Sequence, residues 1–329
     1  MKHGVLLINL GTPSSPTVSG VRAYLREFLT DKRVIDLPAI VRYLLVYGII
    51  IPFRTKKSTH AYQSIWTPEG SPLFTNCQKL TTALQQNMGE HYQVVLGMRY
   101  GKPSLDEALH KLKECSTITV IPLYPQYSSA ATGSSIERVF ELIKDWSIIP
   151  TLRVIRDFYA DPAYIEAQAT LIKPYISEQS FILFSYHGLP ERQINKGGCL
   201  NVCQEECPAP LLKNPGCYKA QCHQTSHLLA QKLNLSSAHY QTAFQSRLGK
   251  TPWIKPYTEE KLTSLSKQGV KNLIIACPSF TADCLETLEE IKLRAQEQWH
   301  NLGGETLTVV PCLNAEAIWV KALKQIVLQ

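Results

Sequence analysis

Residues 181–190 read FILFSYHGLP, an apolar run that ends in a histidine and a Gly-x-Pro turn. A short, continuous apolar run is typical of a strand that is covered on both faces of a parallel sheet. Similar runs alternate with amphipathic stretches along the chain, and this alternation predicts parallel sheets flanked by helices. The expected strands are Val5–Leu10, Val94–Tyr100, Ile118–Leu123, Leu152–Ile155, Phe181–Tyr186, Tyr240–Phe244, Asn272–Cys277 and Leu307–Val310.

The same series of strand endings occurs twice along the chain. The first half contains INLGTP, MRYGKP and TVIPLYPQY, and the second contains FSYHGLP, QSRLGKTP and LIIACPSF. We therefore predict an α/β fold of two similar Rossmann-like domains, residues 1–160 and 161–329, with the last helix as a candidate to pack back on the first domain. The carboxyl ends of the strands of both domains are expected to meet in a cleft between them.

Length and composition restrict the class of protein. The 329 residues suit two domains, and the net charge of +7 suits a carboxylate-bearing small molecule or an acidic membrane surface. Nucleic acid is not expected as a partner, because the sequence has no dense run of lysine and arginine. The apolar run before Gly11 is too short for the core of a signal peptide, so the cytoplasm is the expected location.

Neither half contains a nucleotide-binding motif. No Gly-x-Gly-x-x-Gly follows a strand, and Phe244 stands where a P-loop before Gly249 would need its first glycine. We therefore expect no nucleotide cofactor, which argues against dehydrogenases and ATPases.

An additional apolar segment, residues 36–54, lengthens the first half and is called the apolar lip below. Arg42 and two prolines interrupt it, and it is too short to span a bilayer comfortably. One interpretation is a buried core helix. The other is an exposed apolar surface that contacts a hydrophobic ligand or the inner face of the membrane peripherally, and the flanking Arg54, Lys56 and Lys57 favour it.

Two acid–base side chains follow strands of the second half. His187 comes directly after an apolar strand, where a parallel sheet exposes side chains to its ligand crevice, although a single histidine is often structural. Glu286 lies near the start of a helix, three residues after Asp283. That spacing also fits a capping box, in which both acidic residues would only stabilise the helix start.

Several motifs then make the interpretation more specific: VLLINLGTP, VRAYLREFLTDKRVIDLP, GSPL, PLYPQYS, FSYHGLPER, FQSRLG, PWIKPYT and CPSFTADCLETLEEI. These motifs and their order along the chain, from about residue 4 to residue 314, resemble those of the ferrochelatase family. The resemblance implies two chelatase-type domains around a porphyrin cleft. It also implies a lyase that inserts Fe²⁺ into a porphyrin and needs no nucleotide.

The resemblance also implies roles for individual residues. His187 matches the histidine of the family's SxHG motif, which accepts protons from the pyrrole nitrogens and faces the incoming metal. Glu286 matches the glutamate of the D-x-x-E-T-L segment, on the same side of the porphyrin. Both are therefore expected catalytic residues that contact the Fe²⁺ substrate. The expected porphyrin-binding residues are Arg99, Tyr100, Tyr124, Ser128, Trp253 and Phe280.

The expected substrate follows from positions at which this sequence differs from some members of the family. Leu10 stands where some Gram-positive members have a tyrosine, and together with the apolar lip it favours protoporphyrin IX over coproporphyrin III. The expected product is protohaem, at the last step of haem biosynthesis. Another metal or tetrapyrrole, such as cobalt, stays an alternative, and so does a non-enzymatic carrier of porphyrin or haem. The oligomeric state is left open.

A cysteine-rich insert occupies residues 196–223 of the second domain. It resembles an internal segment that holds a [2Fe–2S] cluster in some bacterial ferrochelatases, and four thiolates suffice for such a cluster. Structural zinc and reduced cysteines without metal are the alternatives. The expected ligands are Cys199, Cys207, Cys217 and Cys222, with Cys203 as an alternate.

Overall fold

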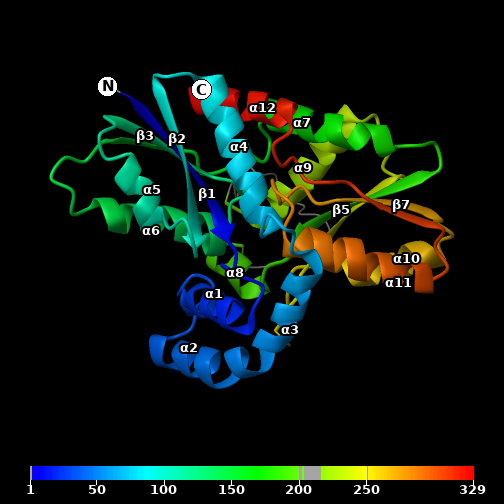
Figure 1. Cartoon of the computed structure of the whole chain (residues 1–329). Coiled ribbons are helices and arrows are strands. Elements are labelled where there is room, and N and C mark those ends of the chain that lie inside the picture. Colours follow the sequence, from blue (N-terminus) through cyan, green and yellow to red (C-terminus); the bar gives the residue numbers. More distant parts are fainter. Residues whose placement is uncertain (1, 200–201, 204–215, 250) are drawn as a thin grey trace. The chain divides into compact units, whose positions relative to one another are not determined.

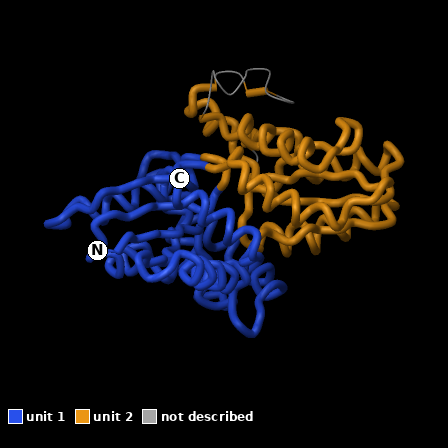
Figure 2. The backbone as a smooth tube through the Cα atoms, turned by 90° about the horizontal axis from the view of Figure 1, so that it is seen from above, with its two compact units in different colours: residues 1–124, 128–157, 314–329 blue, residues 125–127, 158–313 orange. Residues whose placement is uncertain are grey.

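The computed structural model describes residues 2–199, 202–203, 216–249 and 251–329, which fall into two compact units. Figure 2 colours unit 1 blue and unit 2 orange. Unit 1 consists of Met1–Tyr124, Ser128–Asp157 and Asn314–Gln329, and unit 2 consists of Pro125–Tyr127 and Phe158–Leu313. The predicted domains divide the chain at residue 160, with the last helix as a candidate to pack back on the first domain. The units divide it at Asp157 and again at Asn314, where the chain returns to unit 1, and residues 125–127 belong to unit 2.

Unit 1 is built on a parallel sheet with the strand order β2-β1-β3-β4. Leu6 and Ile8 of β1 point into a core that α5 and α6 cover, and Figure 1 shows these two helices together on one side of the sheet. The strands are β1 His3–Gly11, β2 Tyr92–Tyr100, β3 Thr117–Pro122 and β4 Thr151–Val154. The helices are α1 Val18–Thr30, α2 Ala39–Leu45, α3 Ile51–Ile65, α4 Pro72–Met88, α5 Leu105–Lys111, α6 Ser134–Ile143 and α12 Ala317–Leu328, with the π-helical segments η1 Val46–Ile50 and η2 Ser129–Gly133.

Unit 2 repeats this topology, because its parallel sheet has the order β6-β5-β7-β8. Leu183 of β5 and Ile275 of β7 pack with side chains of α10 and with Trp299 of α11 in one apolar core. The strands are β5 Ser180–His187, β6 Tyr240–Gln245, β7 Asn272–Ala276 and β8 Thr306–Val309. The helices are α7 Pro162–Ile172, η3 Lys173–Tyr175, α8 Glu191–Lys196, α9 Tyr218–Lys232, α10 Thr258–Lys267, the π-helix η4 Glu286–Ala295 and α11 Gln296–Asn301.

These two sheets confirm the predicted fold class, two similar α/β domains with parallel sheets flanked by helices. The strands of unit 2 also end close to the positions that the sequence patterns predict. The run FILFSYH becomes β5, which ends at His187, and the strand before FQSR becomes β6, which ends at Gln245. Continuous apolar runs give strands here because both faces of each sheet are covered.

The apolar lip folds as α2, η1 and the first turn of α3. Ile40, Leu44 and Phe53 are 77, 69 and 80% exposed, whereas Val46 and Ile51 are buried. The interpretation of this segment as a buried core helix is therefore wrong, because its larger apolar side chains face outward. Among the described residues, no helix combines the length and the apolar character that crossing a membrane requires.

Candidate active site

His187 is the last residue of β5, and three contacts fix its backbone and ring. Its N–H donates to Ser279 Oγ (3.1 Å), and its carbonyl accepts from the hydroxyl of Tyr218 (2.7 Å). Nδ1 of the ring lies 2.6 Å from the carbonyl oxygen of Gly188. A carbonyl only accepts hydrogen bonds, so in a neutral ring the hydrogen is assigned to Nδ1 and the lone pair to Nε2. The ring is thus oriented to accept a proton at Nε2.

Gly188 allows the chain to turn sharply after the histidine. A Cβ atom there would lie 2.9 Å from the carbonyl oxygen of Gln245, which also accepts the N–H of Gly188 at 2.8 Å. Only glycine permits this close approach of two strand ends. The Gly-x-Pro turn quoted above therefore positions the imidazole at the end of the sheet.

Two of the predicted aromatic residues flank this imidazole. The ring centroids of Trp253 and Phe280 each lie 6.2 Å from that of His187, tilted by 47° and 59°. The indole of Trp253 is held by a hydrogen bond from Nε1 to the carbonyl oxygen of Leu248 (3.0 Å). Unit 2 thus brings together one proton acceptor and two aromatic side chains.

Glu286 is the first residue of η4 and is half-buried. The thiol of Cys284 lies beside its carboxylate, and burial together with this negative charge and hydrogen bond raises the pKa of Cys284 well above its usual value. Cys284 therefore stays a neutral thiol. Asp283 connects the start of the helix to the segment after β8, since its Oδ1 accepts from Thr287 Oγ1 (3.0 Å) and from the N–H of Cys312 (3.3 Å).

Glu286–Ala295 has π-helical hydrogen bonds, which are rare in proteins. Where π-helical turns do occur, they are often found at functional sites. The sequence analysis predicted a helix here and missed this winding. No role was predicted for Gln245 either, whose buried amide contacts the carbonyl oxygen of Glu286 and the carboxylate of Glu290 in the first turns of η4. The motif FQSR, quoted above without a role for its glutamine, was the available signal.

The other four predicted porphyrin-binding residues belong to unit 1. The Arg99 guanidinium donates to Asp31 Oδ2 (2.5 Å) and lies over the ring of Tyr100 at 4.5 Å from its centroid. Tyr100 is 1% exposed, and its hydroxyl also donates to Asp31 (2.9 Å). Asp31 organises this cluster but had no predicted role, although it lies in the motif VRAYLREFLTDKRVIDLP.

Tyr124 and Ser128 follow β3. Tyr124 is half-buried, and burial raises the pKa of its hydroxyl. Ser128 is buried, and its Oγ accepts the N–H of Ala131 (3.2 Å) at the start of η2. The side chain of Ser128 therefore begins a helix.

The cysteine-rich insert is described only in part. Cys217 and Cys222 are buried at the start of α9, and Cys199 and Cys203 are half-exposed. Cys207, one of the predicted ligands, lies outside the described residues. Within the described ranges, no three histidine, cysteine, aspartate or glutamate side chains are grouped to hold a metal ion.

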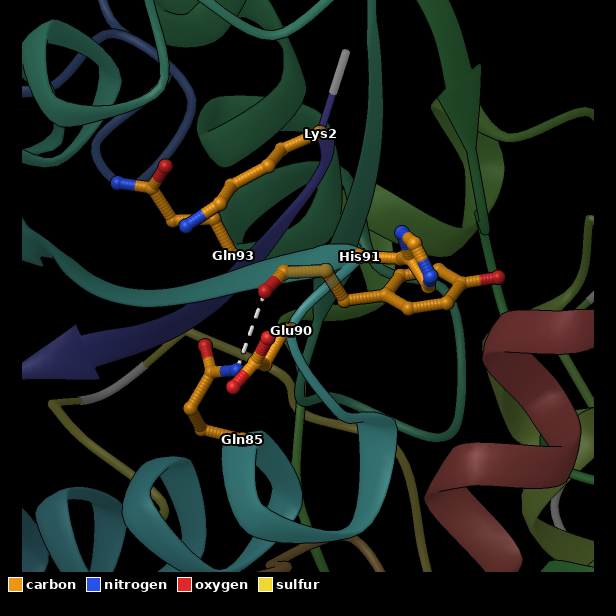
Figure 3. A pocket seen from close by; sticks show the side chains of 6 residues that line it. Lys2, Gln85, Glu90, His91 and Gln93 are labelled. Carbon is orange, nitrogen blue, oxygen red and sulfur yellow. Dashed lines mark hydrogen bonds between the residues drawn. The ribbon is translucent and has the colours of Figure 1, made fainter.

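A hollow of about 580 Å³ lies beside the amino ends of β1 and β2 in unit 1 (Figure 3). Those ends are opposite to the carboxyl ends of the strands, where a site is expected. Gln85 Nε2 donates across the hollow to the carbonyl oxygen of Tyr92 (3.1 Å). Tyr92 is an aromatic lining residue, and the other lining residues are polar or charged, namely Lys2, Gln85, Glu90, His91 and Gln93.

Solved structures share the architecture of this chain. "SirB from Bacillus subtilis with Fe3+" matches with a TM-score of 0.56 and 11% identity, over 99% of this chain and 94% of that chain. The sirohydrochlorin chelatase SirB from Bacillus subtilis subspecies spizizenii, in complex with cobalt, matches with a TM-score of 0.53 and 10% identity, over 98% and 92%. At these identities the likeness shows the fold alone. The fold therefore places the chain among proteins built, like these two, from two similar α/β domains.

The sequence comparisons are more specific. The profile of the ferrochelatase family matches residues 2–329. A ferrochelatase of Legionella pneumophila (strain Paris) is 56% identical over 327 residues, 99% of each chain. A ferrochelatase of Coxiella burnetii (strain CbuK_Q154) is 50% identical over 329 residues, 98% of this chain and 92% of the other. The chain belongs to the ferrochelatase family, whose members are lyases. The predicted family and the predicted enzyme class are therefore confirmed.

Proposed function

We propose that this chain inserts Fe²⁺ into protoporphyrin IX, releases two protons and thereby forms protohaem in the last step of haem biosynthesis. The observation that carries the proposal is the geometry of His187 in a chain of this family. Its imidazole stands at the carboxyl end of β5, its Nδ1 bonds to a carbonyl, and the rings of Trp253 and Phe280 flank it.

The chemistry requires two protons to leave the porphyrin as the metal enters. Two pyrrole N–H bonds break and nitrogen–iron bonds form, so the neutral macrocycle and Fe²⁺ become a neutral complex and two protons. His187 accepts a proton at Nε2 because its Nδ1 hydrogen is engaged with Gly188. The carboxylate of Glu286 attracts the dication and accepts the second proton. The neutral thiol of Cys284 supports Glu286 with a hydrogen bond and does not compete for iron as a thiolate.

The aromatic side chains suit the flat, apolar part of the substrate. Trp253 and Phe280 present faces and edges on which a macrocycle can lie, and both are anchored by protein contacts. Tight binding of a bent ring exposes the pyrrole lone pairs. Binding energy then favours the transition state over the planar substrate.

Protoporphyrin IX is proposed over coproporphyrin III, which carries two more carboxylates. Leu10 at the end of β1 offers no polar group, and the apolar lip is exposed. The test is an anaerobic incubation of the purified chain with Fe²⁺ and each porphyrin, following the loss of porphyrin fluorescence. Faster insertion into coproporphyrin III would refute the substrate, and insertion of cobalt but not iron would refute the metal.

A carrier of porphyrin or haem is distinguished by two substitutions. In an enzyme, His187→Ala and Glu286→Gln lower the rate of insertion and leave porphyrin binding nearly intact. If the purified wild-type chain binds porphyrin with no measurable insertion, the carrier interpretation holds and the proposal fails.

We propose that the apolar lip contacts the inner face of the membrane peripherally. Its exposed Leu44 and Phe53 adjoin the exposed cations Lys56 and Lys57, which suits a surface with anionic lipids. Replacing Leu44 and Phe53 together by serine should weaken sedimentation with vesicles containing phosphatidylglycerol. The matched control is Ile148→Ser, because Ile148 is 84% exposed but lies outside the lip. Equal binding by both variants would contradict the proposal.

We also propose a [2Fe–2S] cluster in the cysteine-rich insert, on the basis of the cysteine spacing in the sequence. Cys199, Cys207, Cys217 and Cys222 would supply the thiolates, with Cys203 as the alternate. Iron and acid-labile sulfide analysis of the purified chain tests it. Iron and sulfide in equal amounts support the cluster, whereas one zinc, or no metal, refutes it.

A further inference from the structure

Gln245 connects the two proposed catalytic residues through the body of unit 2. It is the last residue of β6, and in the parallel register it is the direct partner of His187 on β5. Its backbone carbonyl accepts the N–H of Gly188 (2.8 Å). Only 4% of the residue is exposed, so its side chain lies inside the protein.

The side-chain amide of Gln245 contacts the π-helix. Nε2 donates to the carbonyl oxygen of Glu286 (3.0 Å), and Glu290 Oε2 lies 3.5 Å away. Oε1 accepts from Ser185 Oγ (2.7 Å) and is 3.6 Å from Cys277 Sγ. One buried amide therefore joins β5, the end of β7 and the start of η4.

The next residue reinforces this connection. Ser246 has a φ of 68°, a left-handed conformation that is uncommon outside glycine, asparagine and aspartate. Both its N–H and its Oγ donate to the carboxylate of Glu290, at 2.7 and 2.5 Å. The turn after β6 is thus held against the second turn of η4, and a strained backbone persists only where surrounding contacts determine it.

We propose that Gln245 is a positioning residue that sets the place of Glu286 relative to His187, an inference that rests on the proposed function. Glutamine is suited to this position because a neutral amide supplies a donor and an acceptor together. A carboxylate would face the Glu286 carbonyl and the Glu290 carboxylate without a donor. An apolar side chain would leave the Glu286 carbonyl and the Ser185 hydroxyl without this partner.

The experiment compares Gln245→Met with a control that loses a similar buried amide. Gln168 on α7 is 4% exposed like Gln245, and its Nε2 donates only weakly to Tyr164 at 3.4 Å. Iron insertion is measured for kcat and for the KM of protoporphyrin, alongside porphyrin affinity and thermal stability. Gln245→Met should lower kcat by about 10- to 100-fold, because a displacement of about 1 Å in a reacting group has an effect of that size.

The KM and the porphyrin affinity of Gln245→Met should stay within about twofold of wild type, since residue 245 is buried and only 4% exposed. Gln168→Met should keep the wild-type kcat. A kcat for Gln245→Met within twofold of wild type, or a loss shared equally by kcat and porphyrin affinity, overturns the inference.

Ser185→Ala provides a second test should Gln245→Met fail to fold. It removes one hydrogen bond to the amide and should lower kcat by about fivefold at unchanged KM. An unchanged kcat in that variant also overturns the inference. Absence of iron insertion by the wild-type chain is a different result, because it refutes the proposed function itself.

Discussion

Replacing Asp31 by asparagine should destabilise unit 1 by about 3 kcal/mol at pH 7, at the lower end of the effect of breaking a buried ion pair. The side chains of Asp31 and Arg99 are 5 and 16% exposed, so solvent replaces little of the lost interaction. Oδ2 of Asp31 accepts from Arg99, Tyr100 and Ser134, and Oδ1 accepts from the N–H of Arg33. An asparagine has one oxygen, so its amide group must face a donor on one side.

The pH dependence follows from the direction of the pKa shift. Burial alone would raise the pKa of Asp31, but the hydrogen bonds from Ser134 and the N–H of Arg33, with the charge of Arg99, hold it below the ordinary value of 3.8. A carboxyl group with a lowered pKa in the folded state stabilises the fold above the unfolded-state pKa. This stabilisation is lost as the pH falls below about 3.8 through the folded-state value.

The assay is urea unfolding of the wild type and Asp31→Asn between pH 7 and pH 3, with thermal unfolding at pH 7. The expected loss corresponds to a fall in Tm of about 6 to 12 °C for a unit of this size. Asp145→Asn is the control, because Asp145 is exposed in the same unit. A difference below about 1 kcal/mol at pH 7, or one that stays constant toward pH 3, would refute the reasoning.

Further substitutions test the site and the packing. His187→Ala should reduce the rate of iron insertion by about 100-fold or more, because a general base usually contributes a factor of that size. Glu286→Gln should reduce the rate by at least about 10-fold, and stopped assays of metalloporphyrin absorbance measure both variants. If His187→Ala keeps more than about a tenth of the wild-type activity, the role assigned to His187 is wrong. Gly304→Ala should destabilise unit 2 by about 2–3 kcal/mol in urea unfolding, because its Cβ would lie 2.1 Å from Nε1 of the buried Trp299. Gly48→Ala is the control, because nothing lies within 4 Å of the added Cβ atom, and it should change the free energy of unfolding by less than about 1 kcal/mol. Equal effects of the two substitutions would show that the contact with Trp299 does not determine the loss of stability in Gly304→Ala.

The sequence predicted the two sheets and the strand that ends at His187, because buried parallel strands are continuous apolar runs with turn residues after them. The structure gives β5 as Ser180–His187, against the predicted Phe181–Tyr186. Trp253 and Phe280 were reached through family motifs, and the structure places both beside His187. Composition and periodicity alone would not have selected them.

Other features could not be read from the sequence for physical reasons. The contact between Gln245 and Glu286 depends on which residue of β6 stands beside His187, and a strand pattern does not specify that register. Asp31 and Arg99 are 68 positions apart, so only the folded chain brings their charges together. The π-helical winding of η4 could not be read either, because an amphipathic pattern indicates a helix without specifying which residues its backbone hydrogen bonds join.

The return of the chain to unit 1 at Asn314 has a consequence for how this unit folds. Helix α12 supplies the buried Trp319 and Leu323, and the carbonyl oxygen of Val327 accepts from the Arg153 guanidinium (2.6 Å). These two partners are 174 positions apart in the sequence, with residues 158–313 of unit 2 between them. Contacts between such distant segments form slowly, because the loop between them must be closed before they stabilise the fold. Unit 1 is therefore expected to be completed late in folding, whereas unit 2 is built mainly from one continuous stretch of chain.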